Sequence, residues 1–491
     1  MQMNRFTKKI IKRRIDKKNI QLIKESGYFD EKYYLRNNHD VKEAGVNPIV
    51  HYYHNGWKEG RNPSQKFDTN KYLQYFGNVK ENPILHYLKY KNQYPDFAVP
   101  YAETVTVSNI LKAYYYESES LKTKVVVKRK KHRINIIFKE FNRDIFFGGK
   151  SVPLLLAIIL CNQYDYDLRI ISSEVEANIF YKILELHNLN FKQNVEFFST
   201  SFNMYLDVCQ NDDFICTSWD NVEKVLNTST INGKIFYLIQ DAELNYYGTG
   251  DEYLRVLDTI INERIIPIVD SKILYDYLIK REFNNIKKNG IYFEPAFSKE
   301  MLKPKDSTFK KKDKYKLLYY ATPSPKENLF YFSLEVLNKA LERGVLNPLE
   351  WEIYVLGNEF VPTIEFDSNI KVEMLEDISW TDYCNLLSDI DLCFCTTFAL
   401  RPDYEVLNAI SSGAVCLTNN NDNKKDLSFY SKNIVMSDLE LSDMLKNMEE
   451  AIKLSLNFSK RKENYENSNT YNSWNNAFKE VLEFMNKHIG E

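Results

Sequence analysis

The fold is decided by two stretches, the first of which is Arg133-Ile-Asn-Ile-Ile-Phe-Lys139, an apolar run typical of a buried strand. It continues through Asn142-Arg143-Asp144 into Gly148-Gly149, which opens an apolar helix. Far downstream, Arg401-Pro-Asp-Tyr-Glu-Val-Leu-Asn-Ala-Ile-Ser-Ser-Gly413 predicts a helix that leads into a second strand, Ala414-Val-Cys-Leu-Thr418. Both are strand–helix junctions, where open α/β sheets bind their ligands.

Around the first stretch, strands and helices alternate from residue 133 to about residue 300. Helix-length segments such as Ser151–Gln163 and Glu174–His187 separate several of the strands. This alternation predicts a doubly wound parallel sheet with helices on both faces. The predicted strands are Ile134–Phe138, Leu168–Ser172, Val195–Phe198, Phe214–Thr217, Ile235–Gln240, Ile266–Val269 and Gly290–Phe293.

A second alternation begins after the charged run Lys310-Lys-Lys-Asp-Lys314. Two such sheets joined by a polar linker form a cleft, with ligands at the carboxyl ends of the strands. A final helix, Ser468–Ile489, has one apolar face and is expected to pack back across this cleft. The predicted strands are Lys316–Ala321, Trp351–Leu356, Ile370–Met374, Leu392–Thr396 and Val415–Asn419, and the predicted helices are Asn328–Arg343, Trp380–Ser388 and Tyr404–Ser412.

Bulk composition excludes several classes of function. The 491 residues carry a net charge of only −2, which disfavours a binder of nucleic acid or other polyanions. The seven cysteines include no Cys-x-x-Cys pair, so free buried thiols of a reducing cytoplasm are expected rather than disulfides or a zinc site. No apolar run is long enough to span a bilayer.

The region before the first sheet contains a basic segment and an internal repeat. Residues 1–24 carry nine basic side chains and one acid, Asp16, with isoleucines at helical spacing. This pattern favours an amphipathic helix on an anionic membrane surface over a helix that docks on its own protein. Phe29-Asp30, Asn47-Pro48 and His51-Tyr52 then recur as Phe67-Asp68, Asn82-Pro83 and His86-Tyr87. The repeat predicts pairs of short helices, with the histidines in the core rather than on a metal.

The predicted organisation has six parts. They are a basic amphipathic helix at 1–28, a helical repeat module at 29–95, a linker at 96–132, an N-terminal lobe at 133–312, a C-terminal lobe at 313–467 and a final helix at 468–491.

Two groups of candidate site residues belong to the first lobe. Gly148 and Gly149 can bare their backbone amides to a diphosphate or to sugar hydroxyls, although an ordinary loop has the same composition. Asp241 and Glu243 follow an apolar strand and are candidate catalytic residues that orient an acceptor hydroxyl. Acids at a helix start give the same pattern.

The second lobe contributes the other candidates. Lys326, in the turn after the first strand of this lobe, either faces a departing diphosphate or is a surface lysine. Glu405 opens a helix beside a strand, where its carboxylate can accept both hydroxyls of a ribose. Tyr404, its neighbour, is placed in the same donor site. No G-x-G-x-x-G follows the first strand, which disfavours an NAD enzyme or an epimerase.

These residues resemble a two-lobed (GT-B) glycosyltransferase of family 4, in particular the bacterial rhamnosyltransferase branch typified by WsaF. The resemblance rests on the strand and Gly-Gly turn of Ile134–Lys150, on Gln-Asp-x-Glu within Tyr237–Tyr253, and on Tyr320–Phe330. It also rests on Pro402–Glu405, Ser412–Thr418 and Asn423–Ser428. The repeats resemble modules that precede bacterial polysaccharide glycosyltransferases.

The chain departs from the family pattern at three positions. The first acid of the E-x7-E pair falls on Thr397, so that only Glu405 remains, as in much of the rhamnosyltransferase branch. The usual arginines of the turn fall on Thr322 and Glu327, leaving Lys326 as the nearby cation.

The resemblance implies metal-independent transfer, with retention, of a sugar from a nucleoside diphosphate to a saccharide or lipid-linked glycan acceptor. It implies no cofactor, and dTDP-β-L-rhamnose is the favoured donor. The expected location is the cytoplasm, peripheral to the inner face of a bacterial plasma membrane. The competing hypothesis is a non-catalytic scaffold of a polysaccharide assembly complex, supported by the replaced turn arginines.

Overall fold

The computed structural model of the chain describes residues 16–76, 79–90, 107–115, 119–126, 129–146, 149–201, 204–297, 301–322, 327–357, 363–376 and 378–490. The chain divides into two compact units, Met1–Glu119 and Ser120–Glu491.

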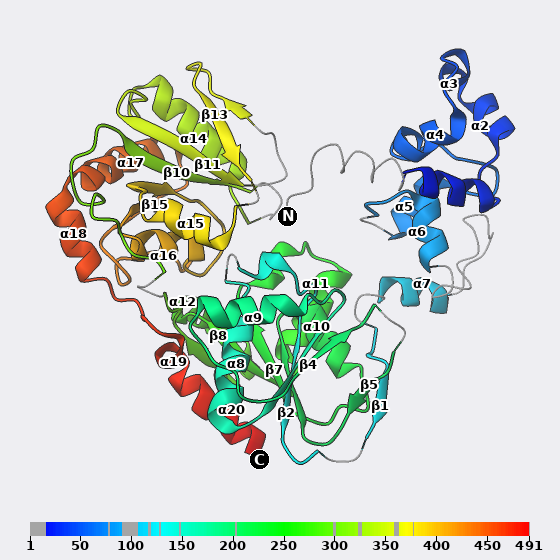
Figure 1. Cartoon of the computed structure of the whole chain (residues 1–491), viewed down its shortest axis with the longest axis horizontal. Helices are drawn as coiled ribbons and strands as arrows, with labels where there is room; N and C mark the ends of the chain where they lie inside the picture. Colours follow the sequence, from blue (N-terminus) through cyan, green and yellow to red (C-terminus); the bar gives the residue numbers. More distant parts are fainter. Residues whose placement is uncertain are drawn as a thin grey trace. The chain divides into compact units, whose positions relative to one another are not determined.

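The first unit is helical (Figure 1). Residues 16–25 are helical, whereas the rest of the predicted basic helix, residues 1–15, lies outside the described residues. The bounds are α2 (Glu31–Asn37), α3 (His39–Glu43), α4 (Pro48–His51), the π-helix η1 (Tyr52–Gly56), α5 (Thr69–Phe76), α6 (Pro83–Tyr90) and α7 (Val107–Tyr114).

Equivalent residues of the two repeats make equivalent contacts. Tyr34 Oη and His51 Nδ1 share a hydrogen bond of 3.0 Å, and Tyr72 Oη and His86 Nδ1 share one of 2.8 Å. Burial lowers the pKa of His86 to about 4, so this imidazole is neutral at physiological pH. The repeated histidines therefore serve the packing of each helical pair.

The second unit contains two seven-stranded sheets, each with helices on both faces (Figure 1). The first lobe has the strand order β4-β3-β2-β6-β7-β8-β9, and all its neighbouring strands are parallel. Its strands are β2 (Arg133–Ile137), β3 (Asp167–Ser172), β4 (Val195–Ser199), β6 (Asp212–Cys216), β7 (Ile235–Ile239), β8 (Ile265–Asp270) and β9 (Ile291–Phe293).

Helices cover both faces of this sheet because its central strands are apolar on both sides. One face packs on α8 (Val152–Tyr164) and α9 (Ala177–Leu186). The helices of the other face are α10 (Trp219–Leu226), α11 (Asp251–Ile261), α12 (Lys272–Lys280) and α13 (Asn284–Asn289).

The second lobe has the order β12-β13-β11-β10-β14-β15-β16, parallel except for the edge pair β12–β13. Helices α14 (Phe330–Glu342) and α17 (Leu441–Leu456) cover one face, and α15 (Trp380–Leu387) and α16 (Tyr404–Ser411) the other. Its strands are β10 (Tyr315–Ala321), β11 (Trp351–Gly357), β12 (Thr363–Glu365), β13 (Lys371–Leu375), β14 (Leu392–Phe394), β15 (Val415–Asn419) and β16 (Ile434–Ser437).

The chain returns from the second lobe to the first at its end. After α18 (Phe458–Glu466) it forms α19 (Trp474–Ala477) and α20 (Lys479–Gly490), and α20 packs on α8 and β9 (Figure 1). The prediction of a single helix over Ser468–Ile489 is wrong in its bounds, because residues 468–473 are not helical and the rest forms two helices that are separated at Phe478. Phe478, Val481 and Leu482 are buried in a core that includes residues of both lobes.

Short strands escaped prediction. The stretch expected to be a linker, 96–132, contains α7 and β1 (Thr123–Val125), and β1 pairs in parallel with β5 (Leu206–Val208). Strands of three residues are too short to show a periodic pattern.

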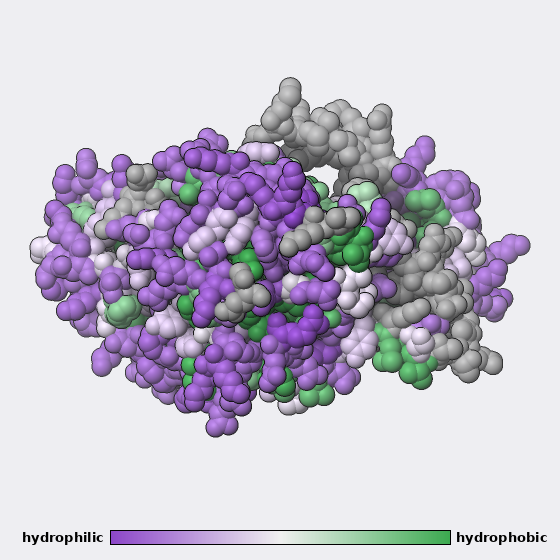
Figure 2. Space-filling model, turned by 90° about the horizontal axis from the view of Figure 1, so that it is seen from below, coloured by the Kyte–Doolittle hydropathy of each residue, from purple (hydrophilic) through white to green (hydrophobic). Residues whose placement is uncertain are grey.

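On the side shown in Figure 2, hydrophilic residues dominate the surface and hydrophobic ones form only small patches. In the ranges described, no helix has the length and apolar character needed to cross a bilayer.

Candidate functional site

The two lobes meet at the carboxyl ends of their central strands. In each sheet the strand order reverses beside the first strand, at β2–β6 and at β10–β14, and such a switch point opens a crevice for ligands. A small cavity between the lobes is lined by Gly149 and Ser151 of the first lobe and by Trp380, Tyr404 and Asn408 of the second. Of the predicted site residues, Gly149 and Tyr404 line this cavity.

Gly149 lies directly against the second lobe, whereas its predicted companion Gly148 lies outside the described residues. Its φ is +76°, a left-handed conformation that favours glycine, and a Cβ at this position would overlap the ring of Tyr404. The carbonyl oxygen of Gly149 accepts a hydrogen bond of 3.0 Å from Gln240 Nε2. The glycine is therefore required by both its backbone conformation and its contact with Tyr404.

Tyr404 connects the lobes through its hydroxyl group as well. Its Oη donates to Asp270 Oδ2 over 2.7 Å, and Gln240 Nε2 donates to the same oxygen over 3.3 Å. Tyr404 and Asp270 are both buried, and burial raises the pKa of Asp270 despite the nearby charge of Arg401. Asp270 was not predicted as a site residue. It is an acid at the end of an apolar strand, and the same signal led to the prediction of Asp241.

Arg401 is the cation at the centre of this junction, and no role was predicted for it. Its guanidinium lies 5.4 Å from the centroid of the Tyr404 ring, and its Nε lies 3.7 Å from Asp241 Oδ2 across the lobes. Burial lowers the pKa of Arg401, but the carboxylates of Asp241, Asp403 and Asp270 outweigh this effect and raise it. Arg401 therefore stays charged inside an acidic cleft.

The two predicted catalytic acids have different surroundings. Asp241 faces the second lobe through Arg401. Glu243, which begins the 3-10 helix η4 (Glu243–Tyr246), instead accepts hydrogen bonds at Oε2 from Tyr237 Oη, over 2.8 Å, and from the backbone amide of Trp219, over 3.2 Å. Burial raises the pKa of Glu243 to about 7. Its contacts lie within the first lobe, where they join η4 to the start of α10.

Glu405 lies in the first turn of α16 and is partly buried. Among the described residues, no side chain or backbone group of another residue hydrogen-bonds to its carboxylate. Burial raises the pKa of Glu405, the charge of Asp403 raises it further, and Arg401 and Lys150 lower it. A partly buried carboxylate without a partner can accept hydrogen bonds from a ligand.

The turn after β10 pairs with the loop after β14. The amide of Phe398 donates to Glu327 O over 2.7 Å, and Asn328 forms a bridge with Thr397. Thr322 accepts a hydrogen bond from the side chain of Asn328. Lys326 lies outside the described residues. Burial raises the pKa of Glu327, and the charge of Asp241 raises it further, so this turn brings a carboxyl group to the cleft.

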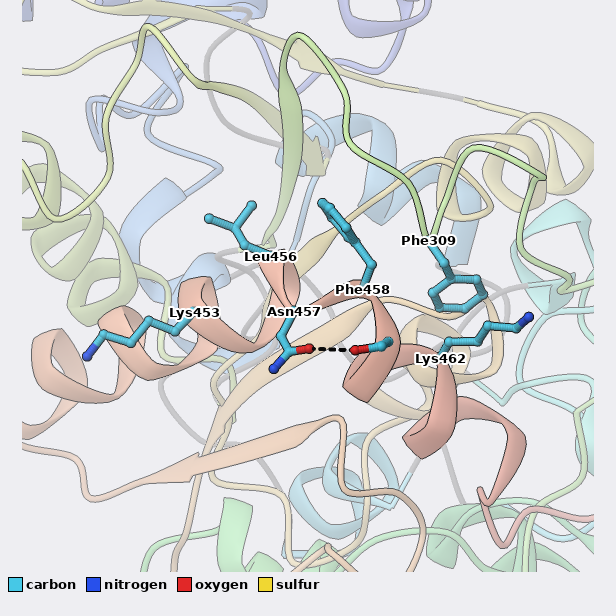
Figure 3. Close-up of a pocket in the computed structure, with 7 residues that line it drawn as sticks. Phe309, Lys453, Leu456, Asn457, Phe458 and Lys462 are labelled. Atoms are coloured by element: carbon cyan, nitrogen blue, oxygen red, sulfur yellow. Dashed lines mark hydrogen bonds between the residues drawn. The ribbon is translucent and has the colours of Figure 1, made fainter.

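Two further features concern other ligands. In the ranges described, no cluster of His, Cys, Asp and Glu side chains is suited to hold a metal ion. A more open and larger cavity than the one between the lobes lies on the second lobe, between α17, α18 and Phe309 (Figure 3). Its lysines, Lys453 and Lys462, pair with Glu450 and Glu466 of their own helices, so the cavity offers no grouping of free charges.

Comparison with known proteins gives the family. Residues 133–272 match the N-terminal domain of WsaF, and residues 315–449 match its C-terminal domain, in the same order along the chain. The chain belongs to the WsaF family. The two matched domains are the two lobes that form the cleft.

Solved structures show the same GT-B fold. HepE from Anabaena, in complex with UDP and glucose, is similar with a TM-score of 0.51 at 13% identity, over 72% of this chain and 99% of HepE. TarM from S. aureus is similar with a TM-score of 0.51 at 10% identity, over 73% of this chain and 99% of TarM. No curated protein matches the chain by sequence. The GT-B architecture predicted from the sequence is confirmed.

We expect Gly149→Ala to destabilise the second unit. The change places a Cβ in the Tyr404 ring and forces alanine to a φ of +76°, at a combined cost of about 2–4 kcal/mol. Gly344→Ala is the matched control, because Gly344 has a φ of +71° and nothing within 4 Å of a Cβ. Urea denaturation of both variants checks the difference, and equal losses of stability would show that the Tyr404 contact contributes nothing.

Proposed function

We propose that the protein is a glycosyltransferase that moves a sugar from a nucleoside diphosphate to a saccharide acceptor. The observation that carries the proposal is the meeting of both lobes at their switch points, with Gly149 and Asp241 on one side and Tyr404 and Arg401 on the other. The resemblance to GT-B glycosyltransferases implies that the donor binds in this cleft, and the two matched WsaF domains are the lobes that form it.

In this proposal the second lobe holds the nucleotide. Glu405 accepts hydrogen bonds from the ribose hydroxyls, because its carboxylate is partly buried and has no hydrogen-bond partner on another described residue. Gly149, together with Gly148, faces the diphosphate and the sugar, Tyr404 borders the same site, and Lys326 supplies a cation near the leaving group. Asp241 contacts the acceptor or sugar hydroxyls.

We assign Glu243 a positioning role in the same site. Its hydrogen bonds from Tyr237 and from the amide of Trp219 hold η4, and hence the segment that carries Asp241, in place. A carboxyl group engaged inside its own lobe is less suited to meet the acceptor than Asp241, which faces the other lobe.

The finer chemistry follows the family resemblance. Transfer proceeds with retention and without a metal, by front-face attack in which the leaving phosphate takes the proton of the acceptor. HepE with UDP and glucose, and TarM with UDP, are neighbours whose complexes support a nucleotide-sugar donor. We favour dTDP-β-L-rhamnose as donor and a cell-surface or lipid-linked glycan as acceptor, at the cytoplasmic face of the membrane with residues 1–24 on its anionic surface.

Two observations favour the non-catalytic scaffold as a second candidate. The Tyr404 ring covers Gly149, and Glu327 places a carboxyl group where a cation is usual. A degenerate cleft of this kind would hold the lobes together without binding a donor.

A thermal-shift screen of the intact chain against UDP-, dTDP- and GDP-sugars separates the two functions. Because a ligand that binds only the folded protein stabilises it, we expect one nucleotide class to raise the melting temperature by a few degrees, saturably with concentration. The result also names the donor. A chain that none of the sugars stabilises would be a scaffold.

A further inference from the structure

The arginine that faces Asp241 has an unused hydrogen-bonding edge. Its Nη1 donates to Pro402 O over 3.3 Å. Its Nε is buried without a hydrogen bond, because the 3.7 Å to Asp241 Oδ2 is too long for one. In the part of the chain that the structure describes, no hydrogen bond uses the edge formed by Nε and Nη2. That edge is the one with which guanidinium binds a carboxylate or phosphate through two parallel hydrogen bonds.

The position of Arg401 fits a ligand that bridges the lobes. Its side chain is 15% exposed, packs over the ring of Tyr404 and points at a first-lobe carboxylate. The ring in turn lies on Gly149. A group bound by the free edge would therefore lie between the glycine turn of one lobe and the β14–α16 loop of the other.

The charges around the cleft identify the kind of ligand. Asp241, Asp270 and Asp403 surround Arg401, and the turn after β10 contributes Glu327 rather than an arginine. Lys424 is fully buried and paired with Asp403 at 3.3 Å, so it is not available to a ligand. Among the described residues at this junction, Arg401 is the cation whose bidentate edge makes no hydrogen bond.

We propose that Arg401 binds the diphosphate of the donor by exchanging partners, releasing Asp241 as the phosphate oxygens occupy its Nε–Nη2 edge. The proposal rests on the glycosyltransferase function proposed above. Arg401 thereby takes over the role of the arginines replaced by Thr322 and Glu327. Donor binding also frees the Asp241 carboxylate, which is then available to an acceptor hydroxyl, so that the donor binds before the acceptor.

Partner exchange makes opposite predictions for the two residues of the ion pair. Arg401→Gln is expected to weaken binding of a nucleoside diphosphate by about 10–100-fold, the range for charged hydrogen bonds. Arg401→Lys keeps the positive charge but not the two parallel donors of the guanidinium, so its affinity for a nucleoside diphosphate is expected to lie between those of the wild type and Arg401→Gln. Asp241→Asn is expected to tighten nucleoside diphosphate binding several-fold, because the competing carboxylate is gone.

The experiment is titration calorimetry of the intact chain and the three variants with UDP, dTDP and GDP, and with the corresponding nucleosides. Nucleosides lack the diphosphate, so we expect Arg401→Gln to leave their affinity unchanged. The inference is overturned if Arg401→Gln binds the diphosphates as the wild type does, if it loses nucleoside affinity equally, or if Asp241→Asn weakens diphosphate binding. Asp241→Asn retains Arg401 and decides the question even where Arg401→Gln fails to fold. A wild-type chain that binds none of the nucleotides overturns the glycosyltransferase function itself.

Discussion

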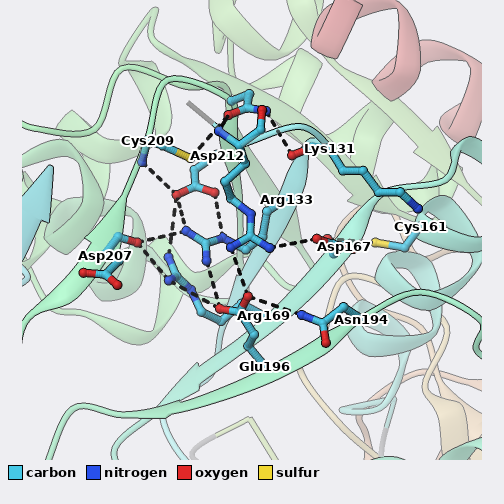
Figure 4. A network of polar contacts seen from close by, with 12 residues as sticks. Lys131, Arg133, Cys161, Asp167, Arg169, Asn194, Glu196, Asp207, Cys209 and Asp212 are labelled. Atoms are coloured by element: carbon cyan, nitrogen blue, oxygen red, sulfur yellow. Dashed lines mark hydrogen bonds and ion pairs between the residues drawn. The ribbon is translucent and has the colours of Figure 1, made fainter. Parts of the chain in front are cut away.

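Replacing Arg133 with methionine is expected to destabilise the second unit by about 3–5 kcal/mol, because it leaves a buried carboxylate without its partner. Arg133 is 2% exposed and Asp212 is 1% exposed. The arginine donates from Nε and Nη2 to the two carboxylate oxygens of Asp212, each over 2.7 Å. Figure 4 shows this pair among the charged residues at the amino ends of β2, β3 and β6.

The remaining contacts of Arg133 explain why the loss should be large. Its Nη1 donates to Glu196 Oε2 over 2.8 Å and its Nη2 to the carbonyl oxygen of Asp207 over 2.9 Å. Arg169 Nη2 lies 3.8 Å from Asp212 Oδ2, too far for a hydrogen bond, and Arg169 is held in place by its own bonds from Nε to Asn135 Oδ1 and from Nη1 to the carbonyl oxygen of Asp207, so it does not replace Arg133. Arg133 thus joins β2 to β4, β5 and β6 at the end of the sheet opposite the cleft.

Urea denaturation of Arg133→Met and of Lys131→Met measures the effect. Lys131 forms an ion pair of 2.6 Å with Asp165 on the surface. Exposed pairs usually contribute little, so Lys131→Met should change the stability only slightly. The double variant Arg133→Met/Asp212→Leu should recover part of the stability, because it removes the stranded charge as well. Equal midpoints for Arg133→Met and Lys131→Met would refute this account of the network.

The same pair predicts a dependence on pH. Burial raises the pKa of Asp212, but the hydrogen bonds and charge of Arg133 outweigh it and lower the pKa below its usual value. The pair therefore stabilises the fold fully above the unfolded pKa of about 3.9 and loses this contribution as pH falls through the lower folded value. The difference between wild type and Arg133→Met should accordingly shrink on acidification, since the stranded carboxylate becomes protonated.

Glu405→Ala is expected to weaken nucleoside diphosphate binding by about 100-fold or more, the effect of losing two charged hydrogen bonds to a ribose. Calorimetry of the intact chain measures this change. Asp443→Ala is the matched control, because Asp443 also lies in the first turn of a second-lobe helix, α17, away from the switch point. Unchanged affinity in Glu405→Ala, or an equal loss in Asp443→Ala, would remove Glu405 from the donor site.

The sequence was sufficient for the architecture because the central strands are continuous apolar runs. β2, β7 and β15 are buried at every position, and each was predicted within one or two residues of its observed bounds. The missed strands β1, β5, β12 and β16 have only three or four residues each, too few to establish a period. Their formation depends on neighbours that are distant in the sequence.

Site residues could be predicted only where their position in the local sequence indicates a role. Glu405 was identified by its place at a helix start beside a strand, and Gly149 by its place in a strand–helix turn. Arg401 has no local signature, since its importance comes from Asp241, 160 positions away and in the other lobe. Glu243 was predicted as a catalytic residue from its local sequence, but only the fold reveals that its carboxylate accepts hydrogen bonds from Tyr237 and from the amide of Trp219.

The most direct test of the account is a crystal structure of the intact chain with the nucleoside diphosphate that stabilises it. We predict the nucleotide in the cleft, with its ribose hydroxyls within hydrogen-bond distance of Glu405 and its diphosphate between Gly149 and Arg401. A nucleotide bound elsewhere, such as in the open cavity beside Phe309, with the cleft unchanged, would contradict it.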